Sequence, residues 1–189
     1  RAASASVSGS AGDTRYSLGL AHNQTDGVNV SSSPTNSGYY PDSDGYRNTS
    51  VSAAISHKIN EANEIGTNLL LAKARNQRDG YVNDAFWNAA AQEYDYRGES
   101  RQASASLWSR HALTDIWTTR LLAGYSMDDS DDFTPVSDAD LSDSKASYTT
   151  RQVQLGWQND IRVGPGTATL GMETLEQRIA SSEDYPVKQ

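Results

Sequence analysis

The stretch Trp117-Thr118-Thr119-Arg120-Leu121-Leu122-Ala123-Gly124-Tyr125 decides the fold of this 189-residue chain. Most of its large apolar residues fall on odd positions, and small or polar residues fill most even positions, so the hydrophobic period is two residues. A period of two is typical of a β-strand with one apolar and one polar face. The stretch is therefore predicted to be such a strand.

The same alternation recurs along the chain, for example in Tyr16–His22, Val51–Ile55 and Val153–Trp157. No segment of useful length has the 3.6-residue period of a helix, so helix is at most local, within 84–92. The pattern predicts an all-β fold of about eight strands, at roughly 2–11, 14–24, 46–58, 64–78, 97–111, 116–127, 149–162 and 167–179.

The connections alternate strictly between short and long. Short turns are predicted at Gly12-Asp13, Asn60–Asn63, Leu113–Asp115 and Gly164–Gly166. Long polar loops are predicted at about 25–45, 79–96 and 128–148, and a fourth begins near Ala180. In an antiparallel up-and-down meander this alternation places every short turn at one end and every long loop at the other. Bacterial outer-membrane barrels have this polarity, with short periplasmic turns and long extracellular loops.

Alternation alone does not say which face is the interior of a barrel, but the residue types do. One parity is rich in Ser and Gln, whereas the other carries Leu18, Leu20, Ile55, Leu69, Leu121 and Leu155. Membrane barrels turn the apolar parity to lipid and line the lumen with polar side chains, whereas small barrels in water pack apolar side chains inside. Aromatic residues on the apolar parity suit an interfacial belt, or ordinary packing in a water-soluble β protein; they are Tyr16, Trp117, Tyr125 and Trp157. We expect the apolar parity to face lipid, and Leu18, Leu69 and Leu155 packed inside a barrel would contradict this.

Composition excludes several other classes. The longest aliphatic run, Leu69–Ala72, is far too short for a membrane helix. The net charge is −8, from 16 basic and 24 acidic residues, which opposes binding to nucleic acid or anionic lipid through counterion release. The absence of cysteine removes disulfides, thiolate zinc sites and cysteine nucleophiles. The three histidines, His22, His57 and His111, have no motif partner, so we expect no enzymatic activity.

Aspartates in the long loops form a candidate metal site. Asp42-Ser43-Asp44-Gly45 has the D-x-D-G spacing that directs two hard oxygen ligands to one side of a tight turn. Asp79 begins the next long loop and Asp95 lies near its end, at the same end of the barrel. Four converging carboxylates suit calcium, which takes 6–8 oxygen ligands, although a solvated acidic loop surface is the alternative.

The third long loop is also acidic. It has seven aspartates between Asp128 and Asp143 and no basic residue among them. An unpaired, mobile loop is the favoured interpretation of this segment.

Several motifs, taken together, resemble a known family in their order and spacing. They are Thr14–His22, Thr25-Asp26-Gly27, Asp42–Tyr46, His57–Glu61, Ile65–Leu69, Asp95-Tyr96-Arg97, Trp157–Asp160 and Gly164–Gly166. This series is similar to the early barrel strands of the TonB-dependent vitamin B12 (cobalamin) transporters.

The resemblance implies a function and a location. Members of the family combine an N-terminal plug, through which TonB acts, with a 22-stranded barrel in the bacterial outer membrane. Neither a plug nor a TonB-contacting segment is recognisable here, so residues 1–189 are expected to be a partial barrel domain of a larger transporter. The implied ligand is cobalamin or another TonB-dependent substrate.

The resemblance also implies a cofactor. In the family, paired calcium ions order the extracellular loops that hold cobalamin. The matching positions here are Asp42, Asp44, Asp79 and Asp95, and Asn29 stands where the family often has an aspartate. Calcium is therefore the expected cofactor, with no organic one.

Two alternatives remain open. One is a complete eight-stranded outer-membrane barrel with a structural or adhesive role, and the other is a water-soluble eight-stranded barrel that binds a small apolar ligand. The length of the parent reading frame separates the first from a transporter segment. Dependence on detergent separates both membrane proteins from the soluble barrel.

Overall fold

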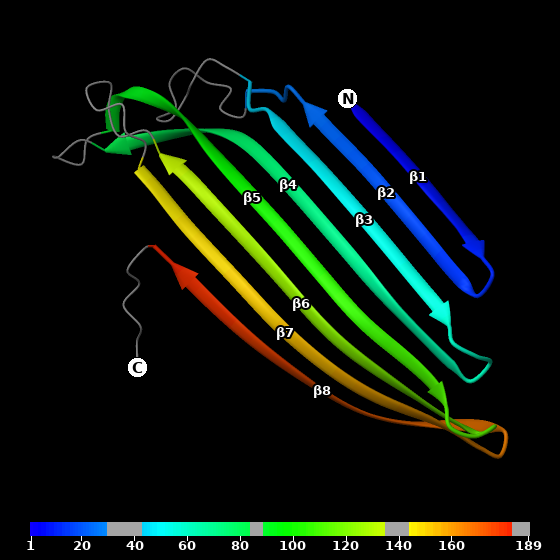
Figure 1. The fold of residues 1–189 in the computed structure, drawn as a ribbon. Helices are drawn as coiled ribbons and strands as arrows, with labels where there is room; N and C mark the ends of the chain where they lie inside the picture. Colours follow the sequence, from blue (N-terminus) through cyan, green and yellow to red (C-terminus); the bar gives the residue numbers. More distant parts are fainter. Residues whose placement is uncertain (30–42, 84–88, 135–143, 183–189) are drawn as a thin grey trace, which may run out of the picture.

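The computed structural model describes residues 1–29, 43–83, 89–134 and 144–182, and all regular structure in these ranges is β-strand. The strands are β1 (Ala2–Ala11), β2 (Thr14–Thr25), β3 (Tyr46–Lys58), β4 (Asn63–Asn83), β5 (Ala89–Ala112), β6 (Trp117–Thr134), β7 (Ser144–Val163) and β8 (Gly166–Ser181). Each strand pairs antiparallel with the next one along the chain, in one sheet of order β1 to β8 (Figure 1). The predicted all-β, up-and-down meander of about eight strands is confirmed. Within the ranges described, no helix is long and apolar enough to cross a membrane.

The connections have the predicted polarity. The short turns at 12–13, 59–62, 113–116 and 164–165 all lie at one end of the sheet (Figure 1). We call the opposite end, where β2, β4 and β6 end and β3, β5 and β7 begin, the long-loop end. Gly12 and Gly164 each have a φ of 57°, a conformation that costs glycine little and other residues more. Glycine at these two positions therefore allows the two shortest reversals of the chain.

Four strands are longer than predicted at the long-loop end. β4 continues to Asn83, β5 begins at Ala89, β6 continues to Thr134 and β7 begins at Ser144. The predicted loops 79–96 and 128–148 are therefore wrong over much of their length, and 89–92, inside the expected local helix, belongs to β5. The physical reason is that polar side chains support these ladders, as in the Arg78–Asp132 ion pair of 3.2 Å, so no apolar alternation marks them.

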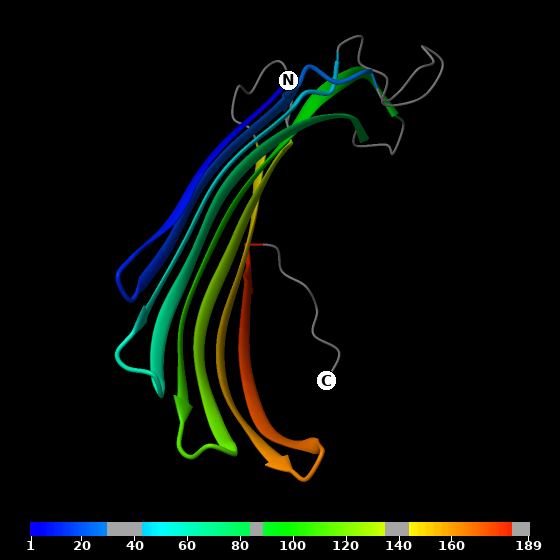
Figure 2. The ribbon, with the colours of Figure 1, turned by 90° about the vertical axis from the view of Figure 1, so that its right-hand side faces the viewer.

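The sheet is curved, and its strand ends are staggered. Figure 2 shows the curvature along the strands and across the sheet. Thr14 is the first residue of β2, and following its register partners across the next six ladders leads to Met172 on β8. Met172 lies six residues beyond Gly166, where β8 begins. A stagger that accumulates in one direction is the shear that the wall of a barrel requires.

The apolar side chains form one exposed face instead of a core. No hydrophobic side chain is buried in the part of the chain that the structure describes. Leu18, Leu69 and Leu155 are 50%, 40% and 51% exposed, and none of them packs in an interior. The register places all three on the same face, which we call the apolar face, and places most Ser and Gln residues on the other, the polar face.

A close approach on the polar face requires glycine. A Cβ added to Gly66 on β4 would lie 2.4 Å from Cζ2 of Trp108 on β5. The indole ring therefore covers the backbone of the neighbouring strand.

Candidate functional site

Asn29 and Asp44 belong to two chain segments that meet at the long-loop end. The backbone N–H of Asp44 donates to the carbonyl of Val28 at 3.3 Å. Gly27 has a φ of 72°, and a Cβ there would lie 1.8 Å from the carbonyl oxygen of Asp44, so this contact requires glycine. Segments 26–29 and 43–45 therefore run side by side, with Asn29 and Asp44 both half-buried.

The same segment is attached to the strand that carries Asp79. The backbone N–H of Gln77 on β4 donates to the carbonyl of Gly45 at 2.9 Å, two residues before Asp79. Asp79 is in turn the direct register partner of Asp95 on β5. The backbone thus places Asp44 beside β4, with Asn29 on the far side of segment 43–45 and with Asp79 and Asp95 opposed in the next ladder. Asp42 and the side chains of Asp79 and Asp95 lie outside the described part of the structure.

The chemistry of these positions fits calcium. Their donors are carboxylate and amide oxygens, the ligand type that calcium prefers. Two like charges directly opposed in a β-ladder are destabilising, and a divalent cation between them reverses the sign of the interaction. Among the described side chains, no group of three or more acidic or histidine residues is arranged to hold a metal. The calcium site therefore stays a prediction.

A polar hollow of about 690 Å³ adjoins these segments. Residues of β2, β3, β4 and β5 line it, including Arg47, Arg75, Arg97 and Glu99 together with Asp26. No sequence motif marks this hollow, because its arginines are far apart in the chain. One pattern in the sequence could have indicated it. Arg47, Arg75 and Arg97 fall on the same odd parity as the apolar residues further along their own strands.

The acidic segment after Met127 was expected to be an unpaired, mobile loop, and its first part is not. Asp128, Asp129, Asp131 and Asp132 belong to β6 and not to a loop. Asp128 accepts from Nε2 of Gln102 at 2.7 Å, and Asp132 pairs with Arg78. The expectation of an unpaired, mobile loop is therefore wrong for this part, and Asp138, Asp140 and Asp143 lie outside the described residues.

Asp131 has its own partners on β7, beyond the apolar part of β6. The hydroxyl of Ser147 donates to its Oδ1 at 2.8 Å, and Nζ of Lys145 lies 3.1 Å from the same oxygen. The hydrogen bond from Ser147, and then the Lys145 ammonium, hold the pKa of Asp131 below its usual value. The carboxylate is therefore charged at neutral pH and engaged within the sheet.

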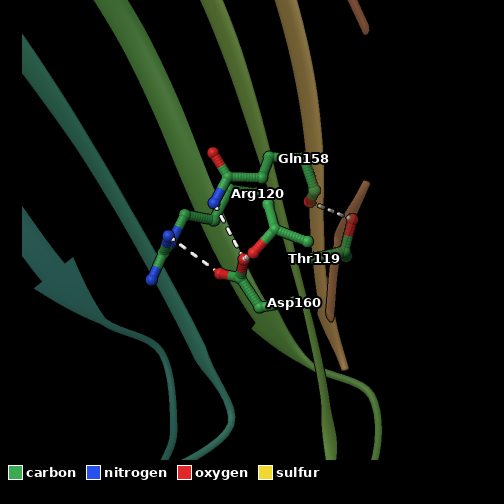
Figure 3. Close-up of polar contacts among 5 residues, drawn as sticks. Thr119, Arg120, Gln158 and Asp160 are labelled. Carbon is green, nitrogen blue, oxygen red and sulfur yellow. Dashed lines mark hydrogen bonds and ion pairs between the residues drawn. The ribbon is translucent and has the colours of Figure 1, made fainter. Parts of the chain in front are cut away.

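The short-turn end is held by contacts between β6 and β7. On the apolar face, Nε1 of Trp117 donates to Oδ1 of Asn159 at 3.0 Å. On the polar face, Asp160 receives Nη1 of Arg120 at 3.0 Å and Nε2 of Gln158 at 2.9 Å (Figure 3). These contacts satisfy polar and charged groups within the sheet. The structural role of these side chains therefore explains their presence.

The three histidines also bond to neighbouring strands. A ring nitrogen of His22 lies 2.8 Å from the hydroxyl of Thr49, and one of His57 lies 2.9 Å from that of Thr14. Nδ1 of His111 lies 2.6 Å from Oδ1 of Asn63. Each ring therefore has a partner in the adjacent strand.

The chain matches no protein-family model, and no curated protein is similar enough to count as a match.

Proposed function

We propose that this chain is part of the wall of a TonB-dependent outer-membrane receptor that binds and imports a cobalamin-like ligand, with calcium ordering its extracellular loops. The observation that supports this most is a wide apolar face on an open sheet whose strands are staggered like those of a barrel.

The apolar face has the height of a bilayer core. On β6 it runs from Trp117 to Met127, with Leu121 and Tyr125 between them. Ten residue steps of about 3.3 Å give about 33 Å along the strand, or about 25 Å along the barrel axis at a tilt of about 40°. The outward apolar band of outer-membrane barrels is about 25 Å tall. An exposed apolar surface of this extent needs a membrane or a large partner.

The edges of the sheet favour a wall segment over a small closed barrel. Within the described residues β1 and β8 do not pair with each other, so each has one unpaired edge. Lipid offers no hydrogen bonds to the N–H and C=O groups of an edge. Further strands of a larger barrel would pair with both edges.

In this proposal, the ligand and calcium bind at the long-loop end. The motifs at 14–22, 42–46 and 95–97 carry the resemblance to cobalamin transporters. Calcium, when bound, would supply the positive charge that holds Asp44, Asp79 and Asp95 together. Loops ordered in advance lose less entropy when a ligand binds, so calcium would tighten ligand binding.

The test uses the full-length protein whose reading frame contains this chain, expressed in a bacterium that lacks its own cobalamin receptor. Outer membranes are isolated and titrated with labelled cyanocobalamin, in calcium and in a chelator, with haem and a ferric siderophore as competitors. We expect saturable cyanocobalamin binding that weakens in chelator and is not displaced by either competitor. Absence of the protein from the outer membrane, or binding of haem or siderophore alone, would contradict the proposal.

A further inference from the structure

Three pairs of basic residues are directly opposed on the apolar face near the long-loop end. Arg47 on β3 is the register partner of Arg75 on β4, and Lys73 on β4 is that of Arg101 on β5. Arg151 on β7 likewise opposes Arg178 on β8, where Glu176 already pairs with Arg178 at 2.6 Å. Like charges directly opposed across a ladder are destabilising by themselves. The first two pairs lie in adjacent ladders, so a further anion beside them would offset this repulsion.

The first two pairs lie where the aliphatic surface ends. Leu71 and Ala103 form the last apolar register pair of β4 and β5, and the next pair on the same face is Lys73 and Arg101. The pair after that along β4 and β3 is Arg75 and Arg47. We call Arg47, Lys73, Arg75 and Arg101 the basic rim. In a barrel wall this rim lies at the level of lipid headgroups.

The rim has more positive than negative charge, although the whole chain is acidic. Glu99 forms ion pairs with two rim residues, at 2.6 Å from Arg75 and 3.9 Å from Lys73. Asp129 is the register partner of Arg101, whereas Asp131 is engaged by Lys145. Asp131 also interacts with Arg101, so with Lys145 included five basic groups face three acidic ones. The side chains of Lys73 and Arg75 are 53% and 59% exposed.

The rim also borders a hollow large enough for a headgroup. Arg47 and Arg75 line the polar hollow of about 690 Å³ together with Arg97 from β5. Guanidinium groups bind phosphate oxygens through paired, charge-assisted hydrogen bonds. The combination of opposed cations, exposure and a polar hollow suits a ligand with more than one phosphate.

We infer that the basic rim binds the phosphate groups of an anionic lipid in the outer leaflet. This inference rests on the proposed place of the chain in the outer membrane. It differs from the expectation from net charge alone, because the basic groups at the rim locally outnumber the acidic groups beside them. The bound lipid relieves the repulsion within the opposed pairs and thereby stabilises β3, β4 and β5 against one another.

The experiment titrates the full-length protein, in detergent micelles, with a bis-phosphorylated glycolipid and with the same lipid after enzymatic dephosphorylation. The readout is the rise in the midpoint of thermal unfolding, from which an apparent affinity follows. We expect only the phosphorylated lipid to raise the midpoint at low concentration, and added salt to weaken the effect. Equal responses to the two lipids would overturn the inference.

Two double variants locate the site. Lys73→Gln/Arg101→Gln removes two rim charges, and we expect its affinity to fall about fivefold for each charge removed. Arg110→Gln/Arg120→Gln removes the opposed pair between β5 and β6 on the polar face, and its lipid response should equal that of the unmodified protein. Equal loss in both variants would overturn the inference. If the rim variant does not fold, Arg101→Gln alone is compared with Arg110→Gln.

The same protein separates this inference from the proposed function. If it is located in the outer membrane and binds cyanocobalamin but does not distinguish the two lipids, only the lipid site is wrong. If it discriminates between the lipids but does not bind cyanocobalamin, only the transport function is wrong.

Discussion

Asp79 on β4 and Asp95 on β5 are direct register partners at the long-loop end. Two carboxylate-bearing residues in this relation repel each other unless a cation lies between them. We therefore expect calcium to raise the thermal stability of the full-length protein, by about 2.7 kcal/mol at a concentration of 100 times Kd.

The matched variants for this prediction are Asp95→Asn and Asp115→Asn. Asp115 lies in the short turn 113–116 at the opposite end of the sheet, so its substitution should leave the calcium response unchanged. Asp95→Asn should abolish most of the response in scanning calorimetry. Equal responses from the two variants would place any bound calcium elsewhere.

The orientation of the sheet is tested by two adjacent leucines on β4. Leu69 lies on the apolar face and Leu70 on the polar face, and they are 40% and 42% exposed. If the apolar face meets lipid, Leu69→Arg should destabilise the protein by about 2–4 kcal/mol. Leu70→Arg should cost much less because it points into an aqueous lumen. Urea unfolding in lipid vesicles measures both, and a larger cost at Leu70 would reverse the assignment of the faces.

Trp117 and Trp157, on the apolar face near the short-turn end, should differ in importance. Trp117 donates to Asn159, which is 3% exposed, so Trp117→Phe leaves a buried amide without this donor, at a cost of about 1–3 kcal/mol. Trp157 donates to the hydroxyl of Thr119 at 3.0 Å, and that hydroxyl also donates to the carbonyl of Gln158 at 3.3 Å. Trp157→Phe should therefore be the milder substitution in the same unfolding assay, and the reverse order would refute the argument.

Packing on the polar face is tested at Gly66. Because a Cβ there meets the Trp108 ring at 2.4 Å, Gly66→Ala should cost about 1–3 kcal/mol. At Gly124, also on the polar face, the nearest atom to an added Cβ is 3.7 Å away, so Gly124→Ala is the control with the same chemical change. Combining Gly66→Ala with Trp108→Leu should recover part of the loss. Additive effects in this double-mutant cycle would mean that the two residues are not coupled.

The sequence predicts those parts of the fold in which apolar and polar residues alternate. The two-residue period predicts the strands around Leu18, Ile55, Leu121 and Leu155, and glycine marks two of the turns. It could not predict the long-loop ends of β4 to β7, because these ladders are supported by ion pairs such as Arg78–Asp132 instead of apolar contacts.

The sequence does not predict the features of the candidate sites that depend on residues far apart in the chain. Lys73 and Arg101 are opposed only because the register of β4 and β5 brings them together, and no local pattern encodes that register. The attachment of Asp44 to Val28 and of Gly45 to Gln77 depends in the same way on tertiary placement. The D-x-D-G motif was visible in the sequence, but its position relative to Asp79 was not.

The strictly sequential strand order has a consequence for the folding pathway. Since every strand pairs only with its neighbours along the chain, each of the four hairpins closes over a short turn at small entropic cost. Topologies with such local pairings have low contact order and fold quickly for a β protein. We therefore expect four hairpins to form as separate units, and the closure of the wider connections between them to be the slower step of assembly.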